Sequence, residues 1–372
     1  MALNPALLAP RRIAARLAAG IDGPLLTIAL ALTAIGLATL YSASIDQPAR
    51  VAAQLVNLAV ALAAMWLASR VPPQTLMRFA PLAYLAGVAL LVAVALYGDV
   101  VNNARRWLHV GVTRFQPSEM MKLALPLMLA WYFHRNEASL RLRDFAFGAL
   151  LLAVPVALIA RQPDLGTAVL VAAAGFYVIF FAGIGWKVLG ALAVLGAASL
   201  VPLWGLLHEY QRKRILTLID PTSDPLGAGY HTIQSTIAVG SGGVGGKGWL
   251  HGTQAHLEFI PERHTDFIFA VFSEEFGLVG NVVLLALYTL LIARGLMIAA
   301  NAATVFARLL AAAITLMFFT YAFVNMGMVS GILPVVGVPL PFISYGGTSL
   351  LTLFIGIGIL MSVHGHRRLV QT

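Results

Sequence analysis

Residues 267–292 read FIFAVFSEEFGLVGNVVLLALYTLLI, and the only charged side chains among them are those of Glu274 and Glu275. An α-helix needs roughly 20 mostly apolar residues to cross about 30 Å of hydrocarbon. This stretch is long enough, and it lacks the alternation of apolar and polar residues that marks the strands of a membrane barrel. It therefore predicts a helix that spans a membrane.

The rest of the chain has the same character. Of its 372 residues, 60% are hydrophobic and only 10% are charged, and the mean hydropathy is +0.87. Soluble domains average about 25% charged residues, so this composition excludes a water-soluble globular fold. The chain has no Cys, which excludes disulfides, thiol catalysis and thiolate metal sites.

Ten stretches near spanning length are bounded by charges, Gly or Pro, and they predict an all-α polytopic membrane protein with ten transmembrane helices. The stretches are 23–41, 51–68, 80–97, 118–133, 145–159, 166–184, 188–207, 267–292, 309–329 and 345–363.

Basic residues indicate the orientation. If ten helices alternate, the basic residues beside the short loops all fall on one side, which the positive-inside bias makes cytoplasmic. We therefore expect one membrane domain over 1–372, with a cytoplasmic N-terminus (1–22) and C-terminus (364–372). A large loop, residues 208–266 between the seventh and eighth helices, is expected outside the cytoplasm. The net charge of +9 fits contact with phospholipid or pyrophosphate head groups, but solvated loop charge explains it equally well.

The first candidate site is the return of this loop into the membrane, which reads HLEFIPERHTDFIFAVFSEEFGLVG over 256–280. Asp266 is expected at the boundary between water and lipid. It is either an acid in the first turn of a helix capped by Thr265, or a general base whose pKa is raised by apolar surroundings. Eight residues separate Asp266 from Glu274, so both acids are expected on one helix face, lining one polar cleft. The spacing of the nearby His residues, His264 among them, matches no zinc site.

The second candidate site reads RRWLHVGVTRFQPSEMMK over 105–122. Glu119 and Lys122 are three residues apart on a helix that begins at Pro117, so they can pair. Trp107 is either an interface anchor or a stacking platform for a sugar. In RQPDLGTA, residues 161–168, Asp164 is at the start of a helix with Arg161 close enough to pair, and capping is the simpler explanation.

Two further segments lack regular hydropathy. GSGGVGGKGW, residues 240–249, is not a P-loop, because Ser241 and Gly248 replace its required Gly and Ser or Thr. It is either a flexible linker or a backbone nest for a pyrophosphate. SGILPVVGVPLPFISYGGTS, residues 330–349, cannot face lipid with unpaired backbone, so we expect it either to be buried in protein or to line a cavity, and to close one side of an outer cleft.

These motifs together resemble the SEDS family, the shape, elongation, division and sporulation proteins, over nearly the whole chain. The resemblance is carried by FQPSEMMKLA (115–124), RQPDLGTA (161–168), GKGWLHGTQAHLEFIPERHTDFIFAVFSEEFG (246–277) and GMVSGILPVVGVPLPFISYGGTS (327–349). The amino-acid sequence of these motifs is most similar to the rod-shape branch, RodA. The division paralogue FtsW is the nearest relative that could be confused with it.

The resemblance implies a peptidoglycan glycosyltransferase of the bacterial inner membrane, with its active site facing the periplasm. It would polymerise lipid II by inverting transfer and release undecaprenyl diphosphate during cell elongation and shape maintenance. Asp266 matches the essential acid of the family. Residues matching the cavity or expected to bind substrate are Trp107, Arg105, Arg114, Glu119, Lys122, Asp164, Glu274, His264 and Thr265.

The expected partners are a class B penicillin-binding protein of the PBP2 type, a transpeptidase, and other membrane proteins of the elongation complex; no nucleic acid is expected. No organic cofactor is expected, while a divalent cation, Mg²⁺ or Mn²⁺, would suit the departing diphosphate. The alternatives are a lipid II flippase, a non-catalytic scaffold for cell-wall synthesis, and an FtsW-like division polymerase. A flippase would need polar residues near the midplane, which this sequence mostly lacks.

Overall fold

The computed structural model describes residues 20–101, 104–110, 113–206, 209–223, 228–257, 259–260 and 262–366. Its long elements are helices, and each apolar stretch of the sequence overlaps one of them. They are α2 (Gly23–Ala43), α3 (Pro48–Arg70), α4 (Pro73–Tyr97), α5 (Pro117–Arg135), α6 (Leu142–Arg161), α7 (Leu165–Phe181), α8 (Trp186–Leu206), α12 (Ile268–Ala300), α13 (Val305–Val329) and α14 (Gly347–Gly365). The all-α prediction is confirmed, and seven of these helices are long and apolar enough to cross a membrane.

The helices begin where local chemistry favours a first turn. Proline occupies the first turn of α3, α4 and α5, where its missing N–H costs nothing. Asp22 caps α2 by accepting a hydrogen bond from the Leu25 amide, and Thr304 caps α13 in the same way. Such caps satisfy backbone donors that a membrane interior would leave unpaired.

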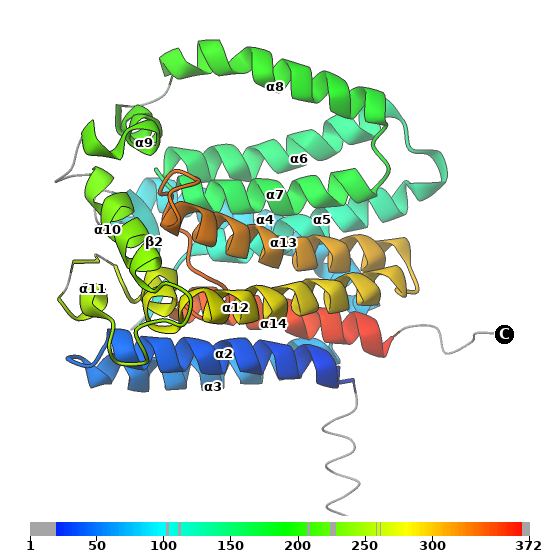
Figure 1. The fold of residues 1–372 in the computed structure, drawn as a ribbon. Coiled ribbons are helices and arrows are strands. Elements are labelled where there is room, and N and C mark those ends of the chain that lie inside the picture. The colour runs from blue at the N-terminus through cyan, green and yellow to red at the C-terminus, as the bar shows by residue number, and fades with distance from the viewer. Residues whose placement is uncertain are drawn as a thin grey trace, which may run out of the picture.

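The helices run side by side as one bundle (Figure 1). In α13, 78% of the most apolar window is buried inside the protein, whereas in α3 only 17% is buried. The α13 helix packs on α5, α7 and α12, so it is the centre of the bundle, while α3 packs on α14 and leaves most residues of its apolar window at least partly exposed. Lipid can accept that exposed surface, since a membrane protein has no need to hide it from water.

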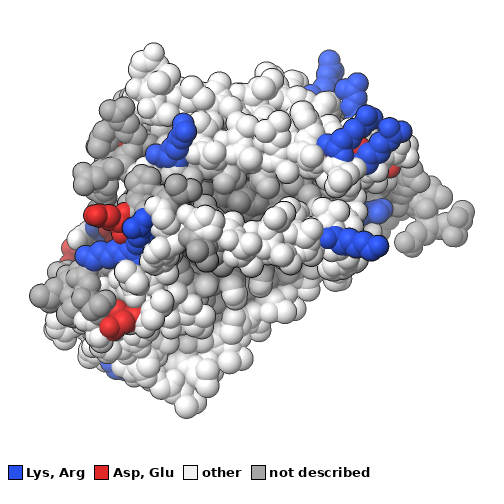
Figure 2. All heavy atoms as spheres, turned by 90° about the horizontal axis from the view of Figure 1, so that it is seen from above, with Lys and Arg blue, Asp and Glu red and all other residues white. Residues whose placement is uncertain are grey.

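Charged residues gather at the two ends of the bundle. Seen from above, Lys, Arg, Asp and Glu lie toward both ends, and the broad belt between them is free of charge on this face (Figure 2). Such a belt is what a hydrocarbon layer requires.

Small elements that the sequence did not predict cover one end of the bundle (Figure 1). Three antiparallel strands, β1 (Asp99–Val101), β2 (Ala104–Val110) and β3 (Thr113–Phe115), form a sheet in that order between α4 and α5. The region expected as a large loop contains α9 (Glu209–Ile219), the 3₁₀ turn η2 (Pro221–Ser223), α10 (Ala228–Ser241) and α11 (Thr253–His256). A further 3₁₀ turn, η1 (Glu137–Ser139), joins α5 to α6.

The α12 helix is broken at Gly277, whose φ is 61° and ψ −158°. The glycine stretch between α10 and α11 pairs with the break: the amides of Lys247 and Gly248 donate to the carbonyls of Glu274 and Glu275, and the Leu278 amide donates to Gly243. A Cβ at position 246 would lie 2.1 Å from the Glu275 carbonyl oxygen. The linker interpretation of this stretch is therefore wrong, because its glycines allow two backbones to approach closely.

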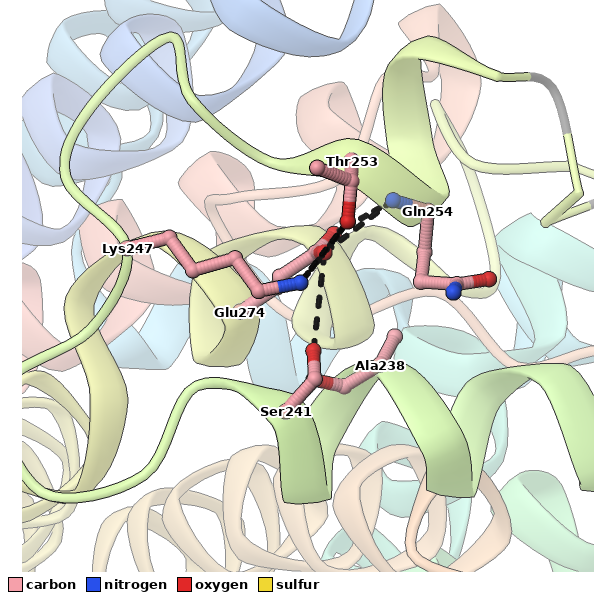
Figure 3. Close-up of polar contacts among 6 residues, drawn as sticks. All are labelled: Ala238, Ser241, Lys247, Thr253, Gln254 and Glu274. Atoms are coloured by element: carbon pink, nitrogen blue, oxygen red, sulfur yellow. Dashed lines mark hydrogen bonds and ion pairs between the residues drawn. The ribbon is translucent and has the colours of Figure 1, made fainter.

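The side chain of Glu274 holds the glycine stretch against the break in α12 (Figure 3). Its carboxylate accepts a 2.6 Å hydrogen bond from Lys247 Nζ, a 3.0 Å bond from Thr253 Oγ1 and a 3.0 Å bond from the Gln254 amide. Glu275 accepts hydrogen bonds from the Ser42 hydroxyl and from the Leu250 amide. Both acids are buried; Glu274 has the cationic partner that a buried carboxylate requires, whereas Glu275 is held by hydrogen bonds to one of its two oxygens.

The opposite end of the bundle is joined by a buried aspartate. Asp22 pairs with Arg294 of α12 at 2.5 Å and lies 3.4 Å from Nε2 of His364 in α14. Burial alone would raise the pKa of Asp22, but the Arg294 guanidinium, the Leu25 amide and His364 together lower it. The ionised carboxylate therefore stabilises the fold at neutral pH.

We expect Asp22→Asn to lower the thermal unfolding midpoint in detergent, because it removes the ion pair but keeps a good N-cap. Asp22→Ala should lower the midpoint further, since it also removes a cap worth about 1 kcal/mol. A carboxyl with a lowered folded pKa stabilises above its unfolded pKa of 3.8 and loses that effect as pH falls below it. The gap between wild type and Asp22→Asn should therefore narrow progressively as pH falls below 3.8 towards the lowered folded pKa of Asp22; a gap that does not depend on pH in this range would contradict this assignment.

Candidate functional site

Asp266 lies in a series of turns, residues 262–267, that precedes α12. The helix begins at Ile268, and its N-cap residue Phe267 makes no side-chain cap. The Thr265 hydroxyl instead donates to the Glu262 carboxylate at 3.0 Å. The prediction that Thr265 caps the helix is therefore wrong, because the chain does not become helical until three residues later.

The segment over 330–346 holds the backbone around Asp266 in place. The Asn325 amide, fully buried at the end of α13, donates to the carbonyls of Asp266 (2.7 Å) and Val338 (2.6 Å). The Ser344 hydroxyl donates to the Thr265 carbonyl at 2.6 Å, and the Tyr345 amide donates to His264 at 2.9 Å. These bonds satisfy backbone groups that no helix or strand pairs, and they fix the position from which Asp266 extends.

The partly buried Asp266 side chain lines a hollow of about 280 Å³, which we call the Asp266 hollow. Helices α9 and α10 form one wall and the 330–346 segment forms another. The lining residues are Thr217, Leu218, His231, Thr232, Glu262, Asp266, Phe267, Pro334, Val335 and Gly337. A hollow of this size is compatible with a monosaccharide unit.

His231 of α10 is a lining residue of this hollow that sequence reasoning missed. Its ring stacks on Phe267 with a centroid distance of 5.7 Å and an interplanar angle of 24°. Burial lowers the pKa of His231, and Glu262 opposes that shift only in part, so the ring is neutral at physiological pH. Its Nδ1 atom is buried and has no hydrogen-bond partner among the described residues. No motif in the sequence marked it, because α10 was expected as loop.

A second, more polar cavity of about 180 Å³ lies among β2, α5, α7 and α14; we call it the Lys122 cavity. Lys122 is 1% exposed, donates to Glu119 Oε1 at 2.5 Å and to the Tyr321 hydroxyl, and lies over the Tyr321 ring. The predicted pairing of Glu119 with Lys122 is confirmed. Its lining residues are Arg106, Trp107, Gln116, Glu119, Lys122, Asp164, Thr167, Leu170, Gly337, Val338, Pro339, Thr348 and Ser349.

Asp164 both caps a helix and lines the Lys122 cavity. Its carboxylate accepts a 3.2 Å hydrogen bond from the Thr167 amide and a 3.2 Å bond from Gln116 Nε2. The neighbouring turn is held by Arg106, whose guanidinium donates to the carbonyls of Gln162 and Pro163. Arg161, the expected partner of Asp164, is exposed and forms no ion pair within the described part of the chain.

The structure brings together only some of the residues selected from the sequence. Trp107, Glu119, Lys122 and Asp164 line one cavity. The backbones of Arg105 and Arg114 are in β2 and β3, but their side chains lie outside the described part. Glu274 does not line the hollow of Asp266: because Asp266 precedes the helix, helical spacing does not bring the two acids to one face. The expected shared cleft is therefore wrong.

His264 also lies apart from Asp266. It is buried, its Nδ1 is 3.0 Å from the Ser44 hydroxyl, and it lines a third hollow with Arg50 and Arg263. Burial, helped by those two arginines, lowers the pKa of His264 to about 4. It is therefore an uncharged hydrogen-bonding group at physiological pH.

Gly337 lines both the Asp266 hollow and the Lys122 cavity, so it marks the place where the two meet. Its φ is 71°, and a Cβ at this position would lie 3.2 Å from Asp266 Oδ2. The expectation that the 330–349 segment lines a cavity is confirmed. Among the described residues, no group of three or more His, Asp or Glu has the arrangement of a protein metal site.

We expect Gly337→Ala to reduce turnover strongly while the protein still folds. A non-glycine residue in this backbone region costs about 1–2 kcal/mol, and the new methyl group would press on the carboxylate of Asp266. Detergent-solubilised protein should keep a cooperative thermal transition, lowered by a few degrees. Full activity in Gly337→Ala would show that the junction is not part of the site.

The chain is similar to known proteins over almost its full length. The FtsW, RodA and SpoVE family, described as cell cycle proteins, matches residues 24–369. The peptidoglycan glycosyltransferase MrdB of Escherichia coli K12 is 50% identical over 352 residues, which are 94% of this chain and 95% of that protein. An FtsW of Thiomicrospira cyclica is 34% identical over 365 residues, covering 95% of this chain and 94% of that protein.

Two solved structures share the fold. A chain from a peptidoglycan synthase complex, described as coordinating polymerization and crosslinking, matches with a TM-score of 0.81 and 35% identity, covering 94% of this chain and 99% of that one. The crystal structure of the rod shape determining protein RodA of Thermus thermophilus matches with a TM-score of 0.71 and 32% identity, covering 93% of this chain and 97% of that one.

Proposed function

This chain belongs to the FtsW, RodA and SpoVE family of cell cycle proteins, and from that membership we propose that it is a peptidoglycan glycosyltransferase. It polymerises lipid II into glycan strands during elongation of the cell and releases undecaprenyl diphosphate. The greater identity to MrdB than to FtsW supports the elongation role over the division role. The observation that carries the proposal is a carboxylate, Asp266, in a saccharide-sized hollow that meets a cavity holding a buried cation.

The proposed reaction inverts the anomeric centre. The 4-hydroxyl of an acceptor GlcNAc attacks C1 of a donor MurNAc, a C–O bond forms, and the bond from C1 to the diphosphate oxygen breaks with its electron pair. Asp266 accepts the hydroxyl proton, because a neutral sugar hydroxyl is a poor nucleophile. The Lys122 ammonium stabilises the departing diphosphate where negative charge develops. The donor then occupies the Lys122 cavity and the acceptor occupies the Asp266 hollow.

A place for the prenyl chain of the donor supports this assignment. An apolar groove of about 280 Å³ among α4, α5 and α14 shares Glu119 and Thr348 with the Lys122 cavity, and its other lining residues include Leu123, Leu127 and Ile355. A substrate whose tail lay in this groove would present its diphosphate to the cavity. A glycosyltransferase built from membrane helices needs such an arrangement, since its substrate remains in lipid.

We also propose ten membrane spans, with α5, α7 and α8 joining the seven helices that are long and apolar enough. The strands and α9 to α11 lie at one end of the bundle, and α14 ends at the other (Figure 1). This supports cytoplasmic termini (1–22 and 364–372), an extracytoplasmic 208–266 region and a periplasmic active site in the inner membrane.

The partner we propose is a class B penicillin-binding protein, a transpeptidase, together with other proteins of the elongation complex. The support is that a similar chain occurs in a complex that coordinates polymerization and crosslinking. Such a complex would synthesise glycan strands and crosslink them at the same place on the membrane.

Binding of a divalent cation, Mg²⁺ or Mn²⁺, beside the Lys122 cavity is a further proposal. The carboxylates of Glu119 and Asp164 line the Lys122 cavity, and Glu119 Oε2 is buried with no hydrogen-bond partner among the described residues. These oxygen donors suit such a cation, which would neutralise diphosphate charge when bound. Loss of turnover in a chelator, restored by adding Mg²⁺ or Mn²⁺, would support it; unchanged turnover would remove it.

The decisive test uses liposomes that contain this protein and its transpeptidase partner, with labelled lipid II supplied only in the outer leaflet. If the protein lies with its periplasmic face outward, the enzyme should form polymer there. A flippase would move lipid II and form none. If the protein were only a scaffold, any polymer would be made by the partner, and replacing the Asp266 carboxylate would leave the amount of polymer unchanged.

A further inference from the structure

A third hollow lies beside the Asp266 hollow at the same end of the bundle. It has a volume of about 290 Å³, opens to the surface, and is lined by Gln47, Arg50, Ile260, Glu262, Arg263 and His264; we call it the Arg50 hollow. Glu262 lines both hollows, so it forms the wall between them. The three spaces therefore follow one another from the Lys122 cavity through Asp266 to Arg50.

The charges around the Arg50 hollow favour an anion. Arg50, half-buried at the start of α3, has no carboxylate within ion-pair distance in the described part of the chain. Arg263 is buried, and Asp46 lies 3.9 Å from it at the exposed surface. The exposed Glu262 carboxylate also lines the hollow and keeps its negative charge while it accepts a hydrogen bond from the Thr265 hydroxyl, so Arg50 is the cation of the hollow that no carboxylate neutralises at ion-pair distance in the described part of the chain. A partly buried guanidinium without a carboxylate partner can form a charge-assisted hydrogen bond with an anion that enters the hollow.

His264 lies beside Arg50 and Arg263 in the lining of this hollow. Arg50 and Arg263 both oppose protonation of His264, which is already disfavoured by burial. His264 therefore adds no charge of its own, and Ser44 fixes its ring. The hollow is lined by two guanidinium groups, an amide, a neutral imidazole and the Glu262 carboxylate, and the planar guanidinium of Arg50 suits a carboxylate or phosphate oxygen.

The lining residues of the Arg50 hollow favour a carboxylate over the phosphate of a lipid. Ile260 is the one apolar side chain among the lining residues, so a lipid diphosphate would find no apolar path for its chain here, in contrast with the groove beside the Lys122 cavity. An anion carried on a water-exposed part of the substrate fits better. On the acceptor, that anion is a carboxylate of the peptide attached to the sugar.

We propose that the Arg50 hollow is a subsite that binds a carboxylate of the peptide carried by the acceptor saccharide. This inference rests on the proposed glycosyltransferase function and extends it. Arg50 acts in binding the acceptor, and it takes no part in the chemical step. The subsite would favour acidic peptides over amidated ones and would hold the acceptor so that its sugar reaches Asp266.

The test compares two forms of labelled lipid II, one with free peptide carboxylates and one in which they are carboxamides. Wild-type protein with its partner should show a KM about fivefold lower for the acidic form, as expected for a partly exposed ion pair. Arg50→Gln should raise the KM of the acidic form by about that factor, leave the KM of the amidated form unchanged, and leave kcat unchanged. Arg50→Lys should restore part of the difference.

The control is Arg161→Gln, which removes an exposed arginine that lines none of the three spaces. It should keep the preference for the acidic substrate. Equal KM values for both substrates in the wild type, or an equal rise for both in Arg50→Gln, would overturn the proposal. Weaker inhibition by undecaprenyl diphosphate in Arg50→Gln would assign the hollow to the diphosphate and also overturn it.

Equilibrium binding of the two lipid II forms to the full chain in nanodiscs separates this proposal from the proposed function, because binding requires no turnover. A preference for the acidic form that disappears in Arg50→Gln would support the subsite even if no polymer were made. Absence of polymer with either substrate would count against the glycosyltransferase function alone.

Discussion

Asp266→Asn is expected to lower lipid II polymerisation by about 10²–10⁴-fold, the usual contribution of a general base. The amide has nearly the same size and can keep the backbone bonds to Asn325, so the fold should be preserved. What disappears is the ability to accept the hydroxyl proton. The measurement is the initial rate of polymer formation by protein purified with its transpeptidase partner.

The matched control for this variant is Asp220→Asn, at an exposed aspartate just after α9 that accepts hydrogen bonds from Thr222. Asparagine also makes such a turn contact, so activity and thermal stability should stay near wild type. If Asp266→Asn polymerises lipid II at the rate of this control, the carboxylate is not the base.

Lys122→Met is expected to lower the rate of lipid II polymerisation strongly and also to destabilise the fold. It leaves Glu119 as a buried carboxylate without its ammonium partner, a change that typically costs about 3–5 kcal/mol. It also removes the buried cation of the cavity, and loss of one group that stabilises developing charge lowers kcat by about 10²–10³-fold. Thermal unfolding in detergent and polymer formation report the two effects separately.

The double variant Glu119→Gln with Lys122→Met separates structure from chemistry. Removing both charges relieves the buried carboxylate, so the unfolding midpoint should recover most of its loss. Turnover should stay low, because no ammonium remains for the diphosphate. Recovery of turnover together with stability would mean that Lys122 serves only to neutralise Glu119.

The sequence predicted those features that depend on local pattern. Apolar length located the helices, and spacing of three residues at the start of α5 predicted the pairing of Glu119 with Lys122. The unpaired backbone of the 330–349 segment predicted that it would line a cavity, which it does on both sides of Gly337.

Features that depend on contacts far apart in the chain could not be predicted in this way. Tyr321 reaches Lys122 from the middle of an apolar helix, where a single hydroxyl gives no signal. The glycine stretch was misinterpreted because its partner, the break at Gly277, is a conformation rather than a motif. Helical spacing failed for Asp266 and Glu274 because only one of the two residues is helical.

The central claim is that the Asp266 carboxylate contacts the hydroxyl of the acceptor sugar. The direct measurement is a map of the Asp266→Asn protein with its partner and bound lipid II, in which turnover is too slow to consume the substrate. The account predicts that the side chain of residue 266 lies about 2.6–3.2 Å from the 4-hydroxyl of the acceptor GlcNAc. An acceptor bound elsewhere, with that hydroxyl out of hydrogen-bond reach even through one water, would contradict it.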